Sequence, residues 1–324
     1  MTSARAEDTN APQPYTRIAN PDTNTTQLQI ALRKFVPRQG SGPTIWLTAV
    51  MHIGEPRYYQ ELQKFLNKQT VVLYEGINPD AHPHHVHDTD ADETAPAQTA
   101  GDTNQNYSMQ STLAHSLGLV FQLDAIDYDR TNFLNSDLTI EQIAQVMGER
   151  PVPANADVKN APNASFNVLL QIMDGSSFLG SIFKAGLEFI GDNPKLRAVA
   201  KLTMIEAIGR LKGNFADIQG LPPDWQKLLK VLIEARNQNL LRDLKEELQK
   251  VPKTGSVAVF YGAGHMDDLE TRVIRDLNYK PSTEKWMTAF SVDLRQTGLT
   301  PFEAEWMRNI IKQQMEQIQP AKTK

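Results

Sequence analysis

Two short apolar runs with a helical segment between them constrain the fold of this chain more than any other feature of its sequence. The runs are PTIWLTAVM, residues 43–51, and TVVLYE, residues 70–75. The segment between them places Tyr58, Leu62 and Phe65 at the spacing of one helix face. Apolar runs of this length are typical of strands that are buried on both faces of a sheet. The order strand, helix, strand therefore predicts a right-handed βαβ unit with parallel strands.

The same alternation continues along the rest of the chain. Segments with the apolar spacing of strands are residues 26–36, 119–127, 256–261 and 285–294, and segments with helical spacing are residues 138–148, 222–250, 266–277 and 301–318. The fold class that this order predicts is α/β, with a mainly parallel central sheet flanked by helices.

Three further segments set the expected domain organisation. Residues 1–24 are expected to be a flexible N-terminal arm. Residues 78–106 contain almost no apolar side chains, so they are expected to form a mobile loop. Residues 150–222 are expected to be a helical insertion. The remainder, residues 25–320, would then be a single α/β domain that contains both the loop and the insertion.

Composition removes several classes of function. Net charge is −5 and the 33 Lys and Arg residues are scattered, so we expect no nucleic-acid partner. The chain has no cysteine, which leaves His, Asp, Glu or water as ligands of any metal. It begins without an apolar leader, which makes a cytoplasmic location the default expectation. Residues 166–191 carry three charged side chains, so no membrane span is expected there, and contact with a membrane surface stays open.

Ionisable side chains follow four of the expected strands. The strands end at His52, at Glu75, among Asp124, Asp127 and Asp129, and at His265. The carboxyl ends of parallel strands share one edge of a sheet, where ligands bind in α/β proteins, so we expect these side chains to converge. Each of them taken alone also fits a structural role. The sequence Gly262-Ala263-Gly264-His265, for example, fits either a turn or a backbone nest for an anion.

The longest expected helix carries two polar residues on its apolar side. Its apolar stripe places Arg236 and Asn237 on the side that should be buried. A buried guanidinium needs a carboxylate partner. Glu75 or an aspartate at the edge of the sheet would supply it.

A second group of histidines stands apart from the strand ends. The sequence HPHHVH at residues 82–87 can capture transition metals without specificity. It lies in the segment least able to hold a rigid geometry, so we do not assign catalytic metal binding to it.

The ordered set of polar residues resembles the motifs of a known family. His52, Glu75, Arg236–Asn237 and His265 stand in the order of the motifs of the TraB/PrgY/GumN/Tiki family. That set is a first G-x-x-H, a glutamate at the next strand end, an Arg-Asn pair on a helix, and a second G-x-x-H. The second motif is intact here, and the first has Ala49 in place of its glycine.

The resemblance covers residues 44–77 and 230–275. It implies a fold like that of the erythromycin-esterase and ChaN-like proteins. Tiki members are described as metal-dependent proteases that prefer manganese or cobalt, and other members shut down peptide pheromones. The wider fold includes an esterase that uses histidine without a metal. The resemblance therefore implies a peptide or small-molecule substrate.

The leading hypothesis is a metal-dependent hydrolase that acts on a peptide or another amide. The expected metal ligands are His52, His265, Glu75 and Asp127, and the ion would be manganese, cobalt, iron or zinc. Arg236 would stabilise a developing oxyanion or orient Glu75, and Asn237 would position the substrate. Two alternatives stay open: a metal-free esterase or amidase with a histidine general base, and a non-catalytic protein that binds a peptide or haem. The sequence does not indicate an oligomeric state.

Overall fold

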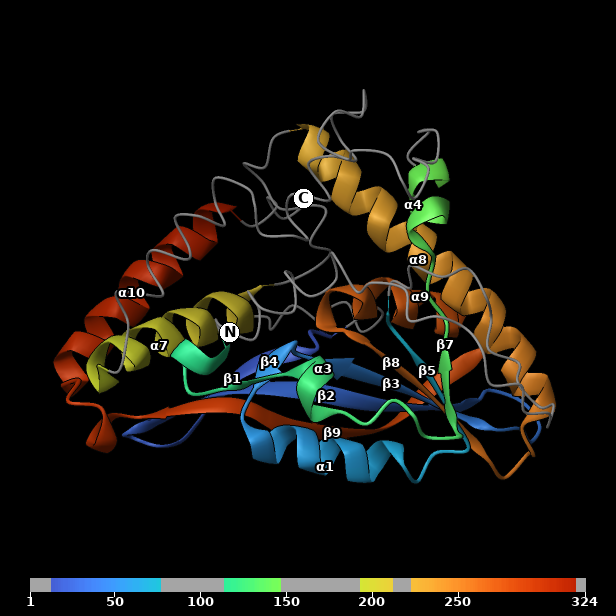
Figure 1. The fold of residues 1–324 in the computed structure, drawn as a ribbon, viewed down its shortest axis with the longest axis horizontal. Coiled ribbons are helices and arrows are strands. Elements are labelled where there is room, and N and C mark those ends of the chain that lie inside the picture. The colour runs from blue at the N-terminus through green and yellow to red at the C-terminus, as the bar shows by residue number, and fades with distance from the viewer. Residues whose placement is uncertain (1–12, 77–113, 147–192, 212–222, 319–324) are drawn as a thin grey trace, which may run out of the picture.

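The computed structural model describes residues 13–76, 114–146, 193–211 and 223–318 (Figure 1). The expected loop 78–106, with its histidine-rich tract, lies outside the described residues, and so do residues 150–192 of the expected insertion.

A seven-stranded sheet forms the centre of the fold (Figure 1). Its strands are β1 (Thr16–Asp22), β2 (Thr25–Pro37), β3 (Thr44–Val50), β5 (Val71–Tyr74), β7 (Phe133–Asn135), β8 (Ser256–Gly262) and β9 (Tyr279–Asp293). Along one side, β2 pairs with β9 over its whole length, and along the other it pairs first with β1 and then with β3. The order continues from β3 through β8 and β5 to β7.

The sheet is mixed, which corrects the expectation of a mainly parallel one. β3, β8, β5 and β7 run parallel to one another, whereas β2 runs antiparallel to β1, β3 and β9. The reason lies in the connections: residues 23–24 join β1 to β2, and residues 38–43 join β2 to β3. A parallel crossover needs a dozen or more residues, so connections this short force antiparallel neighbours. The α/β class itself is confirmed.

The register of the parallel strands brings their carboxyl ends to one edge. Val50 of β3 lies opposite Gly262 of β8, and Tyr74 of β5 lies opposite Phe260. On its other side, Tyr74 lies opposite Asn135, the last residue of β7. The residues that directly follow these strands therefore lie along a common edge.

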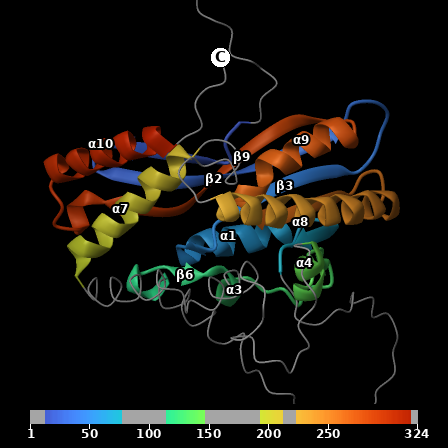
Figure 2. The same cartoon turned by 90° about the horizontal axis from the view of Figure 1, so that it is seen from above.

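Helices cover both faces of the sheet. They are α1 (Pro56–Leu66), α3 (Gln122–Ala125), α4 (Ile140–Val146), α7 (Pro194–Arg210), α8 (Pro223–Lys250), α9 (Met266–Asp276) and α10 (Pro301–Ile318), with short 3-10 helices η3 (Ala263–His265) and η4 (Leu294–Gln296). In the view of Figure 1, α1 lies below the sheet and α7, α8, α9 and α10 lie above it. Figure 2 shows that α7 and α10 lie at one end of the molecule and α8 and α9 at the other. None of the helices in the described ranges is long and apolar enough to cross a membrane.

The core forms where β3 and β8 meet the helices. In β8, every residue from Val257 to Gly262 is buried, as expected for a central strand covered on both faces. From below, α1 contributes Leu62 and Leu66, which are fully buried. Burial of one leucine side chain stabilises a fold by roughly 1.5–3 kcal/mol. This packing makes the strand ends a rigid platform.

Residues 119–127 do not form the strand that was expected there. Val120 and Phe121 form β6, which pairs only with β4 (Ile53–Gly54), and the chain then turns into α3. Because β4 is two residues long, the pairing cannot continue, and the Gln122 N–H donates to the His52 carbonyl instead (2.8 Å). The fourth parallel strand is β7, which the sequence pattern did not indicate.

The N-terminal segment also differs from the expectation of a flexible arm over residues 1–24, because part of it forms β1. Arg33 of β2 donates hydrogen bonds to the carbonyl oxygens of Gln13 (2.6 Å) and Pro14 (2.8 Å). Its guanidinium also lies over the ring of Tyr15, 4.1 Å from the ring centre. These contacts come from a different strand, so the local composition of the segment does not reveal them.

Within the range 150–222, the described residues include α7. This helix packs on β1, β2 and β9, so it covers the antiparallel half of the sheet. The helix expected over residues 222–250 is α8, and the one expected over residues 301–318 is α10.

Candidate functional site

Polar side chains meet where the parallel strands end. His52 follows β3, Glu75 follows β5, and His265 lies in η3 directly after β8. The Nε2 atom of His265 is 3.6 Å from Oε1 of Glu75. The other carboxylate oxygen of Glu75 accepts a hydrogen bond from the Gly262 N–H at 2.6 Å.

Gly262 lies between the Glu75 carboxylate and the His52 ring. A Cβ atom on Gly262 would lie 3.2 Å from Oε2 of Glu75 and 3.3 Å from Nε2 of His52, which is closer than ordinary contact. Its φ of −52° is open to any residue, so the glycine is needed here for space and not for a positive φ. The structure thus brings His52, Glu75 and His265 together around the end of β8.

Arg236 of α8 joins this group through a buried network of ion pairs. Its Nη2 donates to Oε1 of Glu75 at 2.7 Å. Its Nε and Nη2 also donate to the two carboxylate oxygens of Asp137, at 2.8 and 2.6 Å. The Asp137 side chain is fully buried. The expected ion pair between Arg236 and Glu75 is therefore present, and a second carboxylate completes it.

The network sets the charge states of Glu75 and His265. Burial by itself raises the pKa of Glu75, but the Arg236 guanidinium and His265 outweigh it, and the pKa lies well below its usual range. Burial lowers the pKa of His265 below its usual value, although the Glu75 carboxylate opposes this shift. Near pH 7, Glu75 is therefore a carboxylate and His265 is a neutral imidazole.

The side chain of Asn237 determines which nitrogen of His265 carries the proton. Its Nδ2 donates to Oδ2 of Asp268 at 2.8 Å, and a carboxylate can only accept. The Oδ1 atom of Asn237 therefore faces Nδ1 of His265, 2.8 Å away, and must accept from it. The Nε2 atom of His265 consequently keeps its lone pair, which lies on the side of Glu75.

His52 is held in a similar way by Gln122. The Nδ1 atom of His52 lies 2.9 Å from Oε1 of Gln122, and Nε2 of Gln122 donates to the hydroxyl of Tyr128 at 2.8 Å. With Nδ1 as the donor, Nε2 of His52 also keeps its lone pair on the side of Gly262 and Glu75. Two imidazoles that follow different strands are thus each oriented by a carboxamide, and ligand-binding histidines are commonly fixed through their second ring nitrogen.

The two histidines differ in their access to solvent. His52 is exposed, whereas His265 is only 7% exposed. The Nη1 atom of Arg236 also lies 3.4 Å from Nε2 of His265 and can donate to it. His52 is therefore the ring that a water molecule or a ligand reaches first.

Asp127 does not lie in this group. Its backbone exchanges hydrogen bonds with the side chain of Gln63 on α1, and its carboxylate forms an ion pair with Arg130 at 2.8 Å. Asp124 and Asp129 are exposed as well. The strand expected to carry them is replaced by α3, so none of the three follows a strand of the main sheet.

Three polar residues in the network were not among the predicted site residues. They are Asp137, which binds Arg236, Gln122, which orients His52, and Asp268, which orients Asn237. Asp137 follows β7, whose three residues are too few to show a strand period in the sequence. Asp268 lies in the first turn of α9, where an acidic side chain is already explained by the helix N-terminus, so its place in the sequence does not indicate a role in the site.

The donor atoms suit a divalent metal in type, and Arg236 limits how they can be arranged. Two imidazole nitrogens and one carboxylate are ligands that manganese, iron, cobalt and zinc accept. Within the described ranges, no three His, Asp or Glu side chains already surround one point as metal ligands would. The reason is visible at Glu75, where Arg236 and the Gly262 N–H each occupy one oxygen. An ion held by these residues would share Glu75 with Arg236.

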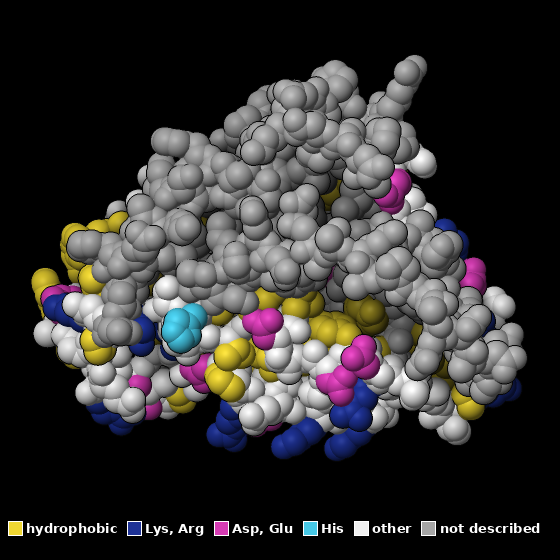
Figure 3. All heavy atoms as spheres, viewed as in Figure 1, with side chains coloured by type: hydrophobic (Ala, Val, Ile, Leu, Met, Phe, Trp, Pro, Cys, Tyr) yellow, Lys and Arg dark blue, Asp and Glu magenta, His cyan; other side chains and the backbone are white. Residues whose placement is uncertain are grey.

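Charged side chains of both signs occur on the face of the molecule that Figure 3 shows. Among the described residues on this face, dark blue Lys and Arg side chains lie along the lower edge of the molecule, and most magenta Asp and Glu side chains lie above them (Figure 3).

Comparison with known proteins adds no family to this geometry. A scan against protein-family models found no match, and searches of curated proteins and of solved structures found no significant match. The resemblance to the TraB/PrgY/GumN/Tiki family thus rests on the motif residues alone and stays a prediction. Ala49, which stands at the place of the first glycine of that pattern, is fully buried opposite Tyr261.

Proposed function

We propose that this chain is a hydrolase of peptides or other amides, with its reaction centre at His52, Glu75 and His265. The observation that carries the proposal is the pair of imidazoles. Each has its Nδ1 held by a carboxamide. Nε2 of His265 lies 3.6 Å from the ionised Glu75 carboxylate, and Nε2 of His52 lies beside Gly262, whose N–H donates to the same carboxylate. Structural histidines do not need two such arrangements at one point.

In this proposal His52, His265 and Glu75 hold a divalent ion of manganese, cobalt, iron or zinc. The ion, when bound, supplies a Lewis acid that activates water at neutral pH. Arg236 keeps Glu75 ionised and provides a fixed positive charge near any oxyanion that develops at the substrate carbonyl. The role of Asn237 becomes the orientation of His265, because its contacts are to His265 and Asp268. Asp127 has no part, because it lies elsewhere.

A second candidate function is a metal-free esterase or amidase. It is favoured by the position of Arg236, which lies between Glu75 and His265 where an ion would compete with it. In this version the exposed His52 is the general base. Its Nε2 accepts a proton from the water molecule that attacks the substrate carbonyl, and the proton then passes to the leaving amine or alcohol.

Calorimetric titration of Mn²⁺ into chelator-stripped protein distinguishes the two candidates. The titration uses the full chain with the four histidines of residues 82–87 replaced by alanine, so that this tract cannot bind the ion. We expect about one ion per chain, with binding lost in His265→Ala and in His52→Ala. His115→Ala serves as the control, because His115 is exposed and does not contact the site.

Absence of Mn²⁺ binding to a folded chain would remove the metal-dependent version. Ester and amide hydrolysis in the presence of chelator would then support the metal-free version if it is lost in His52→Ala. Folding of the variants is checked by circular dichroism, and His52→Ala is the more tolerant of the two because its side chain is exposed.

A further inference from the structure

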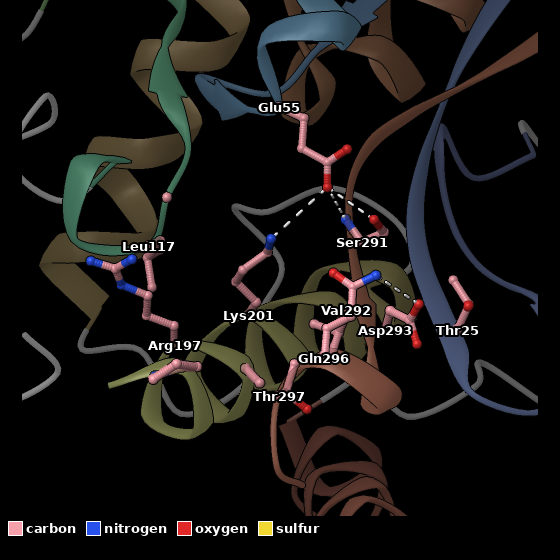
Figure 4. Close-up of a pocket in the computed structure, with 13 residues that line it drawn as sticks. Thr25, Glu55, Leu117, Arg197, Lys201, Ser291, Val292, Asp293, Gln296 and Thr297 are labelled. Carbon is pink, nitrogen blue, oxygen red and sulfur yellow. Dashed lines mark hydrogen bonds and ion pairs between the residues drawn. The ribbon is translucent and has the colours of Figure 1, made fainter. Parts of the chain in front are cut away.

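A cavity of about 490 Å³ lies beside the antiparallel half of the sheet (Figure 4). Its walls are α7, the last residues of β9 with η4, and the turn that leads from β4 into α1. This volume falls in the range of cavities that hold small-molecule ligands. None of the residues assigned to the strand-end site lines it.

Two opposite charges lie close together in the lining of this cavity. Lys201 extends from α7 toward Glu55, which directly precedes α1 (Figure 4). Their side chains are only 16% and 34% exposed, and Nζ of Lys201 is 3.9 Å from Oε1 of Glu55. This separation is too long for a direct hydrogen bond. Among the described residues, Nζ of Lys201 has no hydrogen-bond acceptor.

Glu55 is fixed in place but keeps acceptor capacity. Its Oε1 accepts from the N–H and the hydroxyl of Ser291 on β9, at 2.8 and 2.9 Å. Its backbone N–H donates to the carbonyl of Ala289 at 2.7 Å. Within the described ranges, Oε2 of Glu55 accepts no hydrogen bond. A donor from a ligand would therefore find a preorganised acceptor.

The remaining charges of the lining balance each other. Asp293 is engaged by Arg295, whose Nε and Nη2 donate to its two oxygens at 2.8 Å each. Arg197 lies one turn before Lys201 on α7 and extends toward Leu117 (Figure 4). Among the described residues, the lining has two charges of each sign, Glu55 and Asp293 against Arg197 and Lys201. It favours neither a simple anion nor a simple cation.

We propose that this cavity binds a free α-amino acid, with the ligand carboxylate on Lys201 and the ligand ammonium on Glu55. In an α-amino acid the nitrogen and the nearer carboxylate oxygen are roughly 3 Å apart, as follows from the standard bond lengths. The ligand oxygen then lies beside Nζ of Lys201, and the ligand nitrogen lies beside Oε2 of Glu55, because Oε1 already accepts from Ser291. Each of these contacts is a charge-assisted hydrogen bond. The other lining residues include Leu117, Ala198 and Val292, which suit an apolar ligand side chain.

The binding claim stands apart from the hydrolase proposal, because neither Lys201 nor Glu55 has a role in it. Glu55 does follow His52 by three residues, which limits the separation of their Cα atoms to about 11 Å. If both proposals hold, the cavity lies where an amino acid released at the strand ends would be retained, and this extension rests on the proposed function.

Equilibrium binding of L-leucine to the full chain tests the proposal without measuring turnover. Two truncated analogues of L-leucine separate the contributions of the two ligand charges. 4-Methylpentanoate lacks the ammonium group, and isopentylamine lacks the carboxylate. We expect L-leucine to bind at least about tenfold more tightly than either one, as the loss of one charge-assisted hydrogen bond implies.

Variants of the two protein charges assign the contacts. In Lys201→Met, L-leucine should bind no better than isopentylamine binds to the unchanged chain. In Glu55→Gln, which can still accept from Ser291, it should bind no better than 4-methylpentanoate does. Lys195→Met is the matched control, because Lys195 lies on the same helix, is ion-paired with Glu303 and does not line the cavity.

Three results would overturn the proposal. They are no binding of L-leucine by the folded chain, equal binding of all three compounds, and L-leucine binding that Lys201→Met leaves unchanged. The second result would indicate an apolar pocket only, and the third would place the leucine site elsewhere.

Discussion

Two buried arginines in this molecule each pair with two carboxylates. They differ in whether a group near them keeps an unused hydrogen-bond acceptor. Arg236 binds the carboxylates of Glu75 and Asp137 at the ends of the parallel strands. Arg33 binds those of Glu270 and Glu284 on the antiparallel half. Both guanidinium groups are at most 11% exposed.

All three nitrogen atoms of the Arg33 guanidinium donate hydrogen bonds within the cluster. Its Nε donates to Glu284, its Nη1 donates to Glu270 and to the Gln13 carbonyl, and its Nη2 donates to the Pro14 carbonyl. The hydroxyl of Tyr15 also donates to Glu270 at 2.7 Å. The cluster thus ties the N-terminal segment to the sheet. No histidine takes part in these contacts.

The cluster around Arg236 instead includes a nearby nitrogen atom that can still accept a hydrogen bond. Nε2 of His52 accepts no hydrogen bond from the described residues, and its ring is exposed. A buried ion pair by itself is therefore a poor indicator of a functional site. A buried ion pair beside an accessible, oriented lone pair is a better one.

The largest expected effect tests whether the two arginines are energetically alike. Arg33→Met and Arg236→Met should each lower the free energy of unfolding by about 3–5 kcal/mol, because each leaves buried carboxylates without a counter-charge. Urea unfolding of chelator-treated protein measures this loss.

The same two variants should differ in the pKa of His265, which a titration followed by NMR measures. The Arg236 guanidinium lowers the pKa of His265, so Arg236→Met should raise it. Arg33→Met should leave it unchanged, since Arg33 does not contact the site. An equal pKa in both variants would contradict the distinction between the clusters.

A smaller effect comes from Asp267, whose pKa responds to the Arg33 cluster. Burial and the nearby Glu270 raise this pKa from 3.8 to about 6, although Arg33 opposes the shift. The stability that this group contributes is therefore present below pH 3.8 and is lost as pH rises through about 6. Asp267→Asn should be more stable than the unchanged chain at pH 8, by at most about 3 kcal/mol. Urea unfolding at pH 4 and pH 8 measures the difference, which should shrink at the lower pH.

Glu75 provides the opposite sign for comparison. Because its pKa in the folded chain is well below its usual value, its contribution is present at neutral pH and is lost as pH falls below that usual value. Glu75→Gln should therefore cost most stability at pH 7 and less at pH 4. As pH falls, the stability of Asp267→Asn relative to the unchanged chain should decrease and that of Glu75→Gln should increase. If both relative stabilities changed in the same direction, the charge assignments in one of the clusters would be wrong.

The smallest expected effect concerns the carboxamides that orient the two imidazoles. If the metal-dependent version holds, Asn237→Ala and Gln122→Ala should each weaken Mn²⁺ binding by about 10–100-fold, since partners of this kind fix the ligand orientation. Calorimetric titration measures the affinity. Gln63→Ala is the control, because its side chain contacts Asn67 and Asp127 instead. Unchanged affinity in Asn237→Ala would show that the orientation of His265 does not matter for the ion.

Several features of the fold and the site could be predicted from local pattern. The apolar run of β3, the helical spacing of α1 and the apolar run of β5 predicted a unit that the structure contains, with β8 between the two strands. From this, the rule that parallel strands end at one edge predicted that His52, Glu75 and His265 would meet. The helical stripe of α8 also predicted that Arg236 would be buried beside a carboxylate.

Other features were missed because their signals are too short or not local. β7 has three residues and β6 has two, so neither shows a strand period in the sequence. The aspartates expected at a strand end were Asp124, Asp127 and Asp129, whereas the aspartate that pairs with Arg236 is Asp137. The residues that precede β1 are held in place by Arg33, which lies in another strand. The lining of the cavity brings together Lys201 and Glu55, which are almost 150 positions apart in the sequence, and no motif links them.

The sequence by itself determined the α/β class, the long strands and helices, and the meeting of two histidines and a glutamate at one sheet edge. These follow from apolar periodicity and from the geometry of parallel strands, which act over short stretches of chain. Only the tertiary structure decided the mixed sheet, the Asp137 partner, the protonated nitrogen of His265 and the charge pair across the cavity. Each of these depends on which polar groups remain to be satisfied once distant segments pack together, and a single stretch of sequence does not contain that information.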